Sequence, residues 1–269
     1  MNEKGYESLC RKCLPVVRKA SEFIKGQLGK VAAEDIEAKE KNSLVSYVDK
    51  TAEKMLVEGL HKLLPEAEFL TEEATVDQKE GEVRWIIDPL DGTTNFLHSI
   101  PHFAVSIALE IKDKLVLGIV EEVNTEEVFY AWKEGGAYLN GQRISVRKNH
   151  LISEAIVGTG FPYSVKDSVP MLAILNYWIN NARGIRRKGS AAMDLAYVAC
   201  GRYDFYYETS INAWDVAGGA VLVKEAGGKV VDLEDNEDFL HAGNIIASNG
   251  HLHDEIVKRV SDAYAAISS

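Results

Sequence analysis

Two aspartates three residues apart follow a short apolar run of the chain. Residues 85–87 (Trp-Ile-Ile) lead straight into Asp88, Pro89 comes next, and Asp91 completes an Asp-x-x-Asp spacing. Because proline forces the chain to leave the strand sharply, both carboxylates can converge on one point. Mg²⁺ prefers a few carboxylate oxygens as ligands and lets a substrate phosphate complete its shell. The segment therefore suits magnesium-assisted phosphate chemistry.

The residues after Asp91 suit the binding of an anion. Gly92 permits close approach of the backbone, and Thr93 and Thr94 can open a helix. The first amides of a helix lack partners within it and bind phosphate readily. Taken alone, however, the spacing is more typical of an Asp-Pro turn followed by a capped helix.

Further acids come at positions from which they could join this segment. Glu72 and Glu73 follow a short apolar strand and precede Asp88 by one strand's length of chain. Asp215 follows Trp214 at the start of a helix rich in glycine and alanine. A lone acid at a helix start is more typical of a cap or a partner of the helix dipole. Only the combination of these acids indicates a metal site.

Periodic apolar patterns divide the chain into two parts. Apolar residues recur at helical spacing over residues 6–25 and 49–64, and short strand-like runs follow, which indicates helices packed on an antiparallel sheet. In the second part, strands and helices alternate, as in α/β proteins. We therefore expect an N-terminal α+β lobe with the metal-binding motif (1–147) and a C-terminal α/β lobe with substrate-binding residues (148–269). Ligands are expected in the cleft between them.

Composition and charge exclude several classes of protein. The formal net charge of -11 argues against nucleic acid as a partner, because backbone phosphates are bound by clustered lysine and arginine. No apolar run approaches the roughly 20 residues needed to span a bilayer, so no membrane association is expected. The odd number of cysteines, 3, indicates a reducing compartment, and we expect a cytoplasmic protein. Cys10 and Cys13 form a C-x-x-C pair without a second ligand pair, which predicts two small side chains on a helix.

Five separated segments resemble, in the right order, the signatures of the inositol monophosphatase family. The segment that begins at Asp88 resembles the first signature, and the segment around Asp215 resembles the second. The match extends over essentially the whole chain, and several agreeing motifs are more specific than any one of them. The matching segments are residues 45–49, 72–73, 88–96, 186–196 (as in the bacterial branch) and 211–219.

The resemblance implies a fold, an activity and an assembly. The fold would be the layered α/β/α/β/α sandwich of the sugar-phosphatase superfamily, in the α/β (α+β) class, with the active site between two lobes. The activity would be Mg²⁺-dependent hydrolysis of myo-inositol monophosphate, a small-molecule phosphate monoester, to inositol and phosphate. The resemblance also implies inhibition by Li⁺ and a homodimer.

Metal ligands follow from the resemblance position by position. Glu72, Asp88 and the carbonyl of Leu90 correspond to the ligands of a first ion. Asp88, Asp91 and Asp215 correspond to those of a second, so that Asp88 would bridge the two. Two ions in such a site stabilise both the attacking and the leaving oxygen. The family also implies a third, weaker ion near Glu72.

Catalytic and phosphate-binding groups are implied in the same way. Thr93, paired with Asp49, corresponds to the family's water-activating dyad, and Glu72 lies near that water. The amides of Gly92, Thr93 and Thr94 correspond to the groups that hold the phosphate oxygens.

A second set of positions corresponds to the substrate-binding residues of the family. Carboxylates suit a polyol because they accept hydrogen bonds from neighbouring hydroxyls. The Gly-Ser pair at 189–190 departs from the Gly-Thr of animal members and fits the bacterial ones. Glu208 alone would be more typical of a solvated strand end. The implied set is Asp91, Gly189, Ser190, Ala191, Glu208 and Asp215.

Other functions stay open. Fructose-1,6-bisphosphatases of the archaeal type have a similar first motif, and the basic residues 186–188 could hold a second phosphate, although a surface or dimer contact is more typical of such triplets. Nucleotide phosphatases usually carry Lys-Glu or similar after Asp-Gly-Thr, whereas Thr94, Asn95 and Phe96 follow here. A non-catalytic or regulatory binding protein is the alternative from another class, since some bacterial relatives act through partners in transcription.

Overall fold

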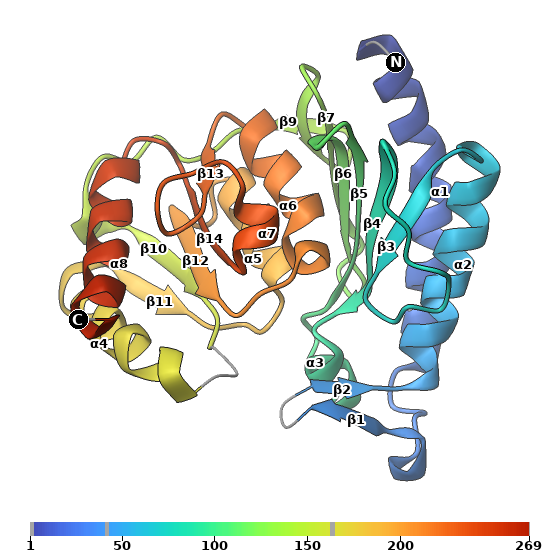
Figure 1. The fold of residues 1–269 in the computed structure, drawn as a ribbon, viewed down its shortest axis with the longest axis horizontal. Coiled ribbons are helices and arrows are strands. Elements are labelled where there is room, and N and C mark those ends of the chain that lie inside the picture. The colour runs from blue at the N-terminus through green and yellow to red at the C-terminus, as the bar shows by residue number, and fades with distance from the viewer. Residues whose placement is uncertain (1–2, 41–42, 162–164, 269) are drawn as a thin grey trace.

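The computed structural model describes residues 3–40, 43–161 and 165–268, and it arranges them in alternating layers of helix and sheet (Figure 1). Two long helices, α1 (Glu3–Gln27) and α2 (Tyr47–Leu63), form the first layer and cover one face of a seven-stranded sheet. In spatial order, the strands of this sheet are β3 (Glu68–Thr71), β4 (Val83–Asp91), β5 (Ala104–Ile111), β6 (Lys114–Glu122), β7 (Glu127–Trp132), β8 (Gly136–Leu139) and β9 (Gln142–Ile144).

Two helices separate this sheet from a second one. They are α5 (Ala191–Ala199) and α6 (Ala213–Glu225), and α4 (Val165–Asn181) and α8 (His253–Ser268) cover the far face of the second sheet. The resulting order of helix, sheet, helix, sheet and helix confirms the predicted α/β/α/β/α sandwich. In spatial order, the strands of the second sheet are β11 (Gly184–Arg186), β10 (Ile156–Thr159), β12 (Phe205–Thr209), β14 (Asn244–Ser248) and β13 (Lys229–Val231).

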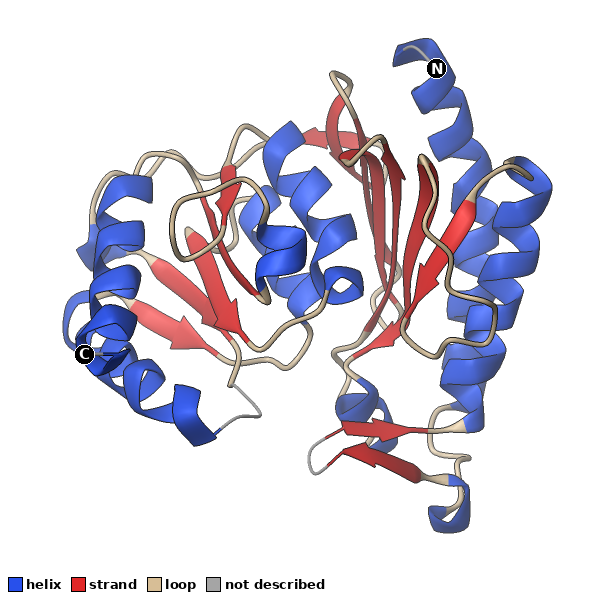
Figure 2. Cartoon of the chain, viewed as in Figure 1, coloured by secondary structure: helices blue, strands red, loops and turns tan. Residues whose placement is uncertain are grey.

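Short elements fill the connections. A small hairpin projects beside α3, away from the two sheets (Figure 2). Within the described ranges, no helix is long and apolar enough to cross a membrane. The short elements are β1 (Glu37–Glu40), β2 (Ser43–Val45), α3 (Thr93–Leu97), α7 (Phe239–Ala242) and two 3₁₀ turns, Ala33–Asp35 and Ile152–Glu154.

The edge strand β3 departs from the predicted antiparallel sheet. It runs parallel to β4, whereas the other neighbouring strands of the sheet are antiparallel. Thr71 at the end of β3 pairs with Ile87 of β4. Because parallel strands end on the same side of a sheet, the chain leaves β3 beside the place where the acidic segment begins.

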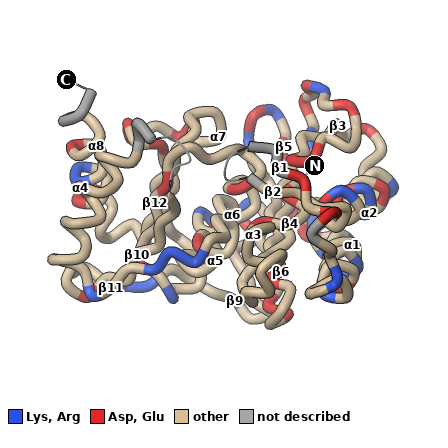
Figure 3. Tube along the Cα trace, turned by 90° about the horizontal axis from the view of Figure 1, so that it is seen from below, with Lys and Arg blue, Asp and Glu red and all other residues tan. Residues whose placement is uncertain are grey.

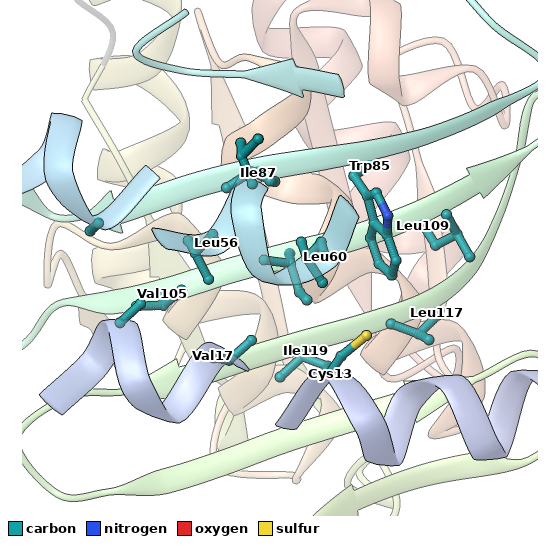
Figure 4. Packing of buried hydrophobic residues seen from close by; sticks show 14 of the residues in the cluster. Cys13, Val17, Leu56, Leu60, Trp85, Ile87, Val105, Leu109, Leu117 and Ile119 are labelled. Carbon is teal, nitrogen blue, oxygen red and sulfur yellow. The ribbon is translucent and has the colours of Figure 1, made fainter. Parts of the chain in front are cut away.

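The core between the helices and the first sheet follows the alternation of β4. Trp85 and Ile87 point toward the helices, where Leu56 and Leu60 of α2 pack against them (Figure 4). Side chains two apart in a strand share a face, so the intervening residues point to the other side of the sheet. Fully burying such a side chain contributes about 1.5–3 kcal/mol. This layer therefore holds β4, and with it Asp88 and Asp91, firmly against the helices.

The Cys-x-x-Cys pair belongs to the same core. Cys10 and Cys13 lie on α1 and are fully buried. Burial raises the pKa of both thiols, that of Cys10 to about 12. Their burial on one helix confirms the prediction of two small side chains within α1.

Helix α6 packs against both sheets. Its Gly218 approaches β6 so closely that a Cβ on Gly118 would lie 2.4 Å from the Gly218 carbonyl oxygen. On its other side, α6 contacts β13 and β14 of the second sheet. Because one helix layer serves both sheets, the division into lobes at residue 147 stays a prediction.

Candidate active site

Strand β4 carries Asp88 and Asp91 on a bulge. Asp88 pairs with Ser106 and Asp91 with Ala104, so three steps on β4 match two steps on β5. In a regular strand, residues three apart point to opposite faces, and the extra residue of the bulge returns them to one face. The sharp exit expected at Pro89 is therefore wrong. The proline sits within the bulge, where its missing N–H breaks no ladder bond.

Glu72 lies beside this bulge because of the parallel pairing of β3. Its amide donates a hydrogen bond of 3.2 Å to the carbonyl of Ile87, the residue before Asp88. The acids expected to share a first ion thus start from adjacent strand ends.

Thr93 and Asp49 contact each other across 44 positions of sequence. Thr93 Oγ1 lies 2.9 Å from Asp49 Oδ1 and 3.0 Å from the carbonyl oxygen of Leu90, so its single proton can go to either. The other carboxylate oxygen of Asp49 accepts hydrogen bonds from the amide and hydroxyl of Ser46, in a capping box at the start of α2. Asp49 is fully buried, and burial raises its pKa although these hydrogen bonds oppose the shift.

Gly92 precedes α3 in a left-handed conformation with φ of 93°. A Cβ there would lie 3.1 Å from the carbonyl oxygen of Gly189 and 3.2 Å from that of His102. Glycine is therefore required for the geometry and for the close approach of the two segments. The predicted helix start at Thr93 is confirmed, and Thr94 is exposed in its first turn.

The second half of the chain reaches the same place through Asp91. One carboxylate oxygen, Oδ2, accepts a hydrogen bond of 2.6 Å from the hydroxyl of Ser190 and one of 2.7 Å from the amide of Ala192. Asp215 lies in the first turn of α6, where its carboxylate accepts a 2.7 Å hydrogen bond from the amide of Asn212. Glu208, near the end of β12, is half-buried and bonded to the hydroxyl of Tyr206.

These residues line one cavity of about 130 Å³. The structure brings together Glu72, Asp91, Gly189, Ser190, Ala191, Glu208 and Asp215, all of which were predicted from the sequence. Asp88 is buried. The lining residues of the cavity do not include Asp88, Asp49, Leu90, Gly92, Thr93 or Thr94.

The carboxylates of the site repel one another. Burial raises the pKa of Asp88 well above its usual range, and the charges of Glu72, Asp91 and Asp215 raise it further. Burial likewise raises the pKa of Asp91 to about 6, although Ser190 opposes the shift. Burial and the charge of Asp91 hold the pKa of Asp215 well above normal. A divalent cation among these groups would relieve this repulsion.

The donor set fits a hard divalent cation. It consists of carboxylate oxygens and one backbone carbonyl, the ligands that Mg²⁺ prefers. As placed, the acidic, histidine and cysteine side chains of the described residues form no group of three around a common point. Glu72, Asp88, Asp91, Asp215 and the carbonyl of Leu90 are the groups that would hold it.

Three buried polar residues near the site were missed as functional residues. Asn95 donates hydrogen bonds to the carbonyls of His102 (2.7 Å) and Lys188 (2.8 Å), and so ties α3 to the second half of the chain. Asp194 lines the cavity, and burial raises its pKa, with a further rise from Glu208. Both lie inside the segments that resemble the family, which was the available signal. The third residue is Glu53 of α2.

The basic triplet, residues 186–188, begins at the last residue of β11 and continues toward α5 (Figure 3). Arg187 lines the cavity, and its guanidinium carbon lies 5.1 Å from the ring centre of Phe161. Lys188 Nζ instead lies 5.0 Å from the ring centre of Tyr197, outside the cavity. One cation of the three therefore faces the site.

Solved structures with the same fold are known. The five-layered sandwich is the sugar-phosphatase fold, which this chain shares with solved structures. The crystal structure of the extragenic suppressor protein SuhB from Bartonella henselae superposes with a TM-score of 0.88 at 36% identity, covering 94% of this chain and 98% of that chain.

Sequence relatives agree with the structural match. An inositol-1-monophosphatase of Rhizobium meliloti (strain 1021) is 41% identical over 238 residues, or 88% of this chain and 90% of the relative. The Nus factor SuhB of Haemophilus influenzae is 40% identical over 227 residues, or 84% of this chain and 85% of the relative. The inositol monophosphatase family matches residues 8–265, and the chain belongs to this family. Membership supports a phosphatase activity on a small phosphate ester, and the family is generally metal-dependent.

Proposed function

We propose that this protein is a Mg²⁺-dependent phosphomonoesterase that hydrolyses myo-inositol monophosphate to inositol and phosphate. The observation that carries the proposal is the cavity in which Glu72 and Asp91 from one half of the chain meet Glu208 and Asp215 from the other. A structural protein would have no reason to bury acids that raise one another's pKa. The name of the Rhizobium relative supports inositol monophosphate as the substrate.

The chain's own residues would prepare a water for attack on phosphorus. When bound, Mg²⁺ supplies positive charge that offsets the carboxylates and the phosphoryl oxygens. The Thr93 hydroxyl donates a hydrogen bond to Asp49, so its oxygen is free to accept a hydrogen bond from the water. Glu72 is expected to accept the water's other proton. The water oxygen bonds to phosphorus as the ester bond to the inositol oxygen breaks, and the departing oxygen takes up a proton from a second water molecule, so that inositol leaves as the alcohol.

Other groups would hold the substrate during this step. The amides of Gly92, Thr93 and Thr94 at the start of α3 bind phosphate oxygens. On the polyol side, burial raises the pKa of Glu208 to about 7, so this group exchanges protons near neutrality. It accepts hydrogen bonds from hydroxyls when ionised and donates one when protonated. Ser190 and Ala191 complete this side of the cavity.

Phosphate release tests this proposal directly. Inositol 1-phosphate, fructose 1,6-bisphosphate and adenosine 3',5'-bisphosphate are offered with Mg²⁺ or with EDTA. We expect turnover of inositol 1-phosphate that requires Mg²⁺ and that falls at least about 10³-fold in Asp88→Asn. Asp113→Asn, at the exposed β5–β6 turn, serves as the matched control and keeps full activity. Absence of turnover on all three substrates would overturn the proposal.

Fructose 1,6-bisphosphate is the second candidate substrate. Arg187 lines the cavity and could pair with a second phosphate. If the bisphosphate turns over faster and Arg187→Gln loses this activity, the bisphosphate is the substrate in place of inositol monophosphate. The metal chemistry would be unchanged.

A regulatory binding role is the candidate from another class. Relatives named Nus factor SuhB are 37–40% identical to this chain. Affinity capture with the tagged protein, with and without Mg²⁺, tests this role. A stoichiometric partner that binds equally well to Asp88→Asn would establish a role separate from catalysis.

The remaining expectations belong to the same proposal. We infer a homodimer that is sensitive to Li⁺ and acts in the cytoplasm, with family membership as the support. We also retain the two-lobe division at residue 147. Sedimentation at several protein concentrations tests the dimer, and a Li⁺ titration of phosphate release tests the inhibition.

A further inference from the structure

Glu53 is a fully buried glutamate on α2, one helical turn after Asp49. Its carboxylate accepts three hydrogen bonds from a turn that is 20 positions away in sequence. The amide of Glu73 donates to Oε2, and the amide and hydroxyl of Thr75 both donate to Oε1, each at 2.7 Å. Three hydrogen bonds to one buried side chain hold this turn against α2.

The turn that Glu53 holds carries Glu72. Ala74, inside the turn, has φ of 48°, a conformation that residues with a Cβ rarely adopt. Such a backbone persists only where its surroundings impose it. The three hydrogen bonds to Glu53 supply that constraint, because they fix the amides on both sides of Ala74.

Glu72 is consequently fixed from both sides. Its own amide donates to the carbonyl of Ile87, next to Asp88, and the following amide, that of Glu73, donates to Glu53. These two bonds set where the Glu72 side chain leaves the backbone relative to Asp88.

One face of α2 thus contacts both the start of α3 and the turn after Glu72. Residues four apart on a helix lie on one face, and here Asp49 binds Thr93 while Glu53 binds the turn after Glu72. We propose that Glu53 is a positioning residue that holds the backbone of Glu72 beside Asp88, so that both carboxylates can contribute to one Mg²⁺ site. This inference rests on the proposed metal-dependent function.

The expected consequence is a selective loss of metal affinity. Glu53→Gln keeps the size of the side chain but turns an N–H group toward one of the donating amides, so at least one hydrogen bond is lost. Substitutions of groups that orient a metal ligand typically weaken metal binding about 10–100-fold. The phosphate-binding amides of α3 belong to another segment, so KM at saturating Mg²⁺ should change less than about threefold.

Two measurements on the whole 269-residue chain test this inference. Calorimetric titration with Mg²⁺ should give a dissociation constant at least about tenfold higher for Glu53→Gln than for wild type. Hydrogen exchange in EDTA should be faster at the amides of Glu73 and Thr75. Asp204→Asn is the matched control, because Asp204 is fully buried, accepts hydrogen bonds from Ile156 and Asn149, and lies at the opposite end of β12 from Glu208. This control should lose thermal stability without losing Mg²⁺ affinity.

A double-mutant cycle separates positioning from general destabilisation. If Glu53 acts through Glu72, then Glu53→Gln should weaken Mg²⁺ binding in the wild-type background and add little in a Glu72→Gln background. Thr75→Val removes only one hydroxyl donor to Glu53 and provides a milder variant if Glu53→Gln does not fold.

Each outcome has a distinct meaning. Wild-type protein that binds no Mg²⁺ would overturn the proposed function itself. If Glu53→Gln and Thr75→Val bind Mg²⁺ as tightly as wild type does, the positioning role alone is overturned. Equal losses in both backgrounds of the cycle would assign Glu53 to overall stability and reject its action through Glu72.

Discussion

Gly92 and Gly141 have similar backbone conformations but very different surroundings. Both have positive φ, 93° and 85°, yet a Cβ on Gly92 would meet two backbone carbonyls within 3.2 Å, whereas one on Gly141 would meet nothing within 4 Å. Substituting each glycine therefore separates the free-energy cost of the backbone conformation, present at both positions, from that of the close contact with Gly189 and His102, present only at Gly92.

Gly92→Ala should therefore damage both stability and catalysis. We expect a loss of about 1–3 kcal/mol in the free energy of unfolding and of about 100-fold in kcat/KM, because α3 must move away from Gly189. Gly141→Ala should cost about 1–2 kcal/mol and leave kcat/KM unchanged. Urea unfolding and phosphate release measure the two quantities. Equal kcat/KM in both variants would show that the close approach at Gly92 is dispensable.

At the scale of residues, the sequence predicts which residues form the site better than it predicts how they lie relative to one another. Asp88, Asp91 and Asp215 were recognisable because family signatures surround them. That Asp88 and Asp91 share a face depends on a bulge that only the pairing with β5 defines. Glu53 carries no local signal, since it resembles any charged residue on a helix. Its burial comes from a turn 20 positions later.

At the scale of elements, α1 and β6 enclose a carboxyl group outside the active site. Glu121 is buried, and its Oε1 lies 3.1 Å from Nη1 of Arg18 on α1. Burial raises the pKa of Glu121 to about 7, although Arg18 opposes the shift, and Glu126 and Glu22 add to it.

This raised pKa gives stability a definite dependence on pH. The folded protein holds a proton on Glu121 up to about pH 7, whereas the unfolded chain releases it near 4.5. The resulting stabilisation is complete below the lower value and is lost as pH rises through the upper one. Glu121→Gln stays neutral throughout. Its stability relative to wild type should increase between pH 5 and pH 7 and then level off.

Urea unfolding in EDTA at pH 5, 6, 7 and 8 measures this trend. Glu126→Gln is the control, because Lys25 lowers the pKa of this exposed neighbour from 4.5, so its effect on stability changes only below that value and should stay nearly constant from pH 5 to pH 8. A stability difference between Glu121→Gln and wild type that does not vary with pH would contradict the raised pKa.

Most elements were predictable because their signals are local. Amphipathic helices follow from periodicity, and α1 and α2 lie close to their expected ranges, 6–25 and 49–64. The parallel pairing of β3 with β4 was not predicted, because strand direction depends on where a connecting segment leads the chain. The continuation of β4 past Pro89 was missed for the same reason, since a bulge tolerates a proline that a regular strand rejects.

At the scale of the whole molecule, the acidic cavity couples metal binding to stability. Carboxylates from both halves of the chain repel one another there, and a cation that binds only the folded state stabilises it. At a Mg²⁺ concentration of 100 times the dissociation constant, the gain is about 2.7 kcal/mol. We expect melting temperature to rise with Mg²⁺ and to return to its starting value with EDTA.

Differential scanning fluorimetry measures this shift. In Asp88→Asn the shift should be strongly reduced, while Asp113→Asn should behave as wild type. A melting temperature that does not change at millimolar Mg²⁺ would contradict the metal site.

The layered architecture was predictable only through resemblance, since periodicity alone predicted two lobes and no order of layers. Contacts such as Ser190 with Asp91, which are 99 positions apart, lie beyond any local pattern. Family signatures carried that information because they record residues that meet in space.

The position of α6 between the two sheets has a consequence for synthesis on the ribosome. The inner face of the first sheet is complete by residue 144, yet the helix that covers it spans Ala213–Glu225. A nascent chain must therefore carry an uncovered apolar sheet face while about 70 further residues emerge. Chaperones that hold nascent chains have their clearest target in that interval, and slower translation of this stretch would prolong the exposure.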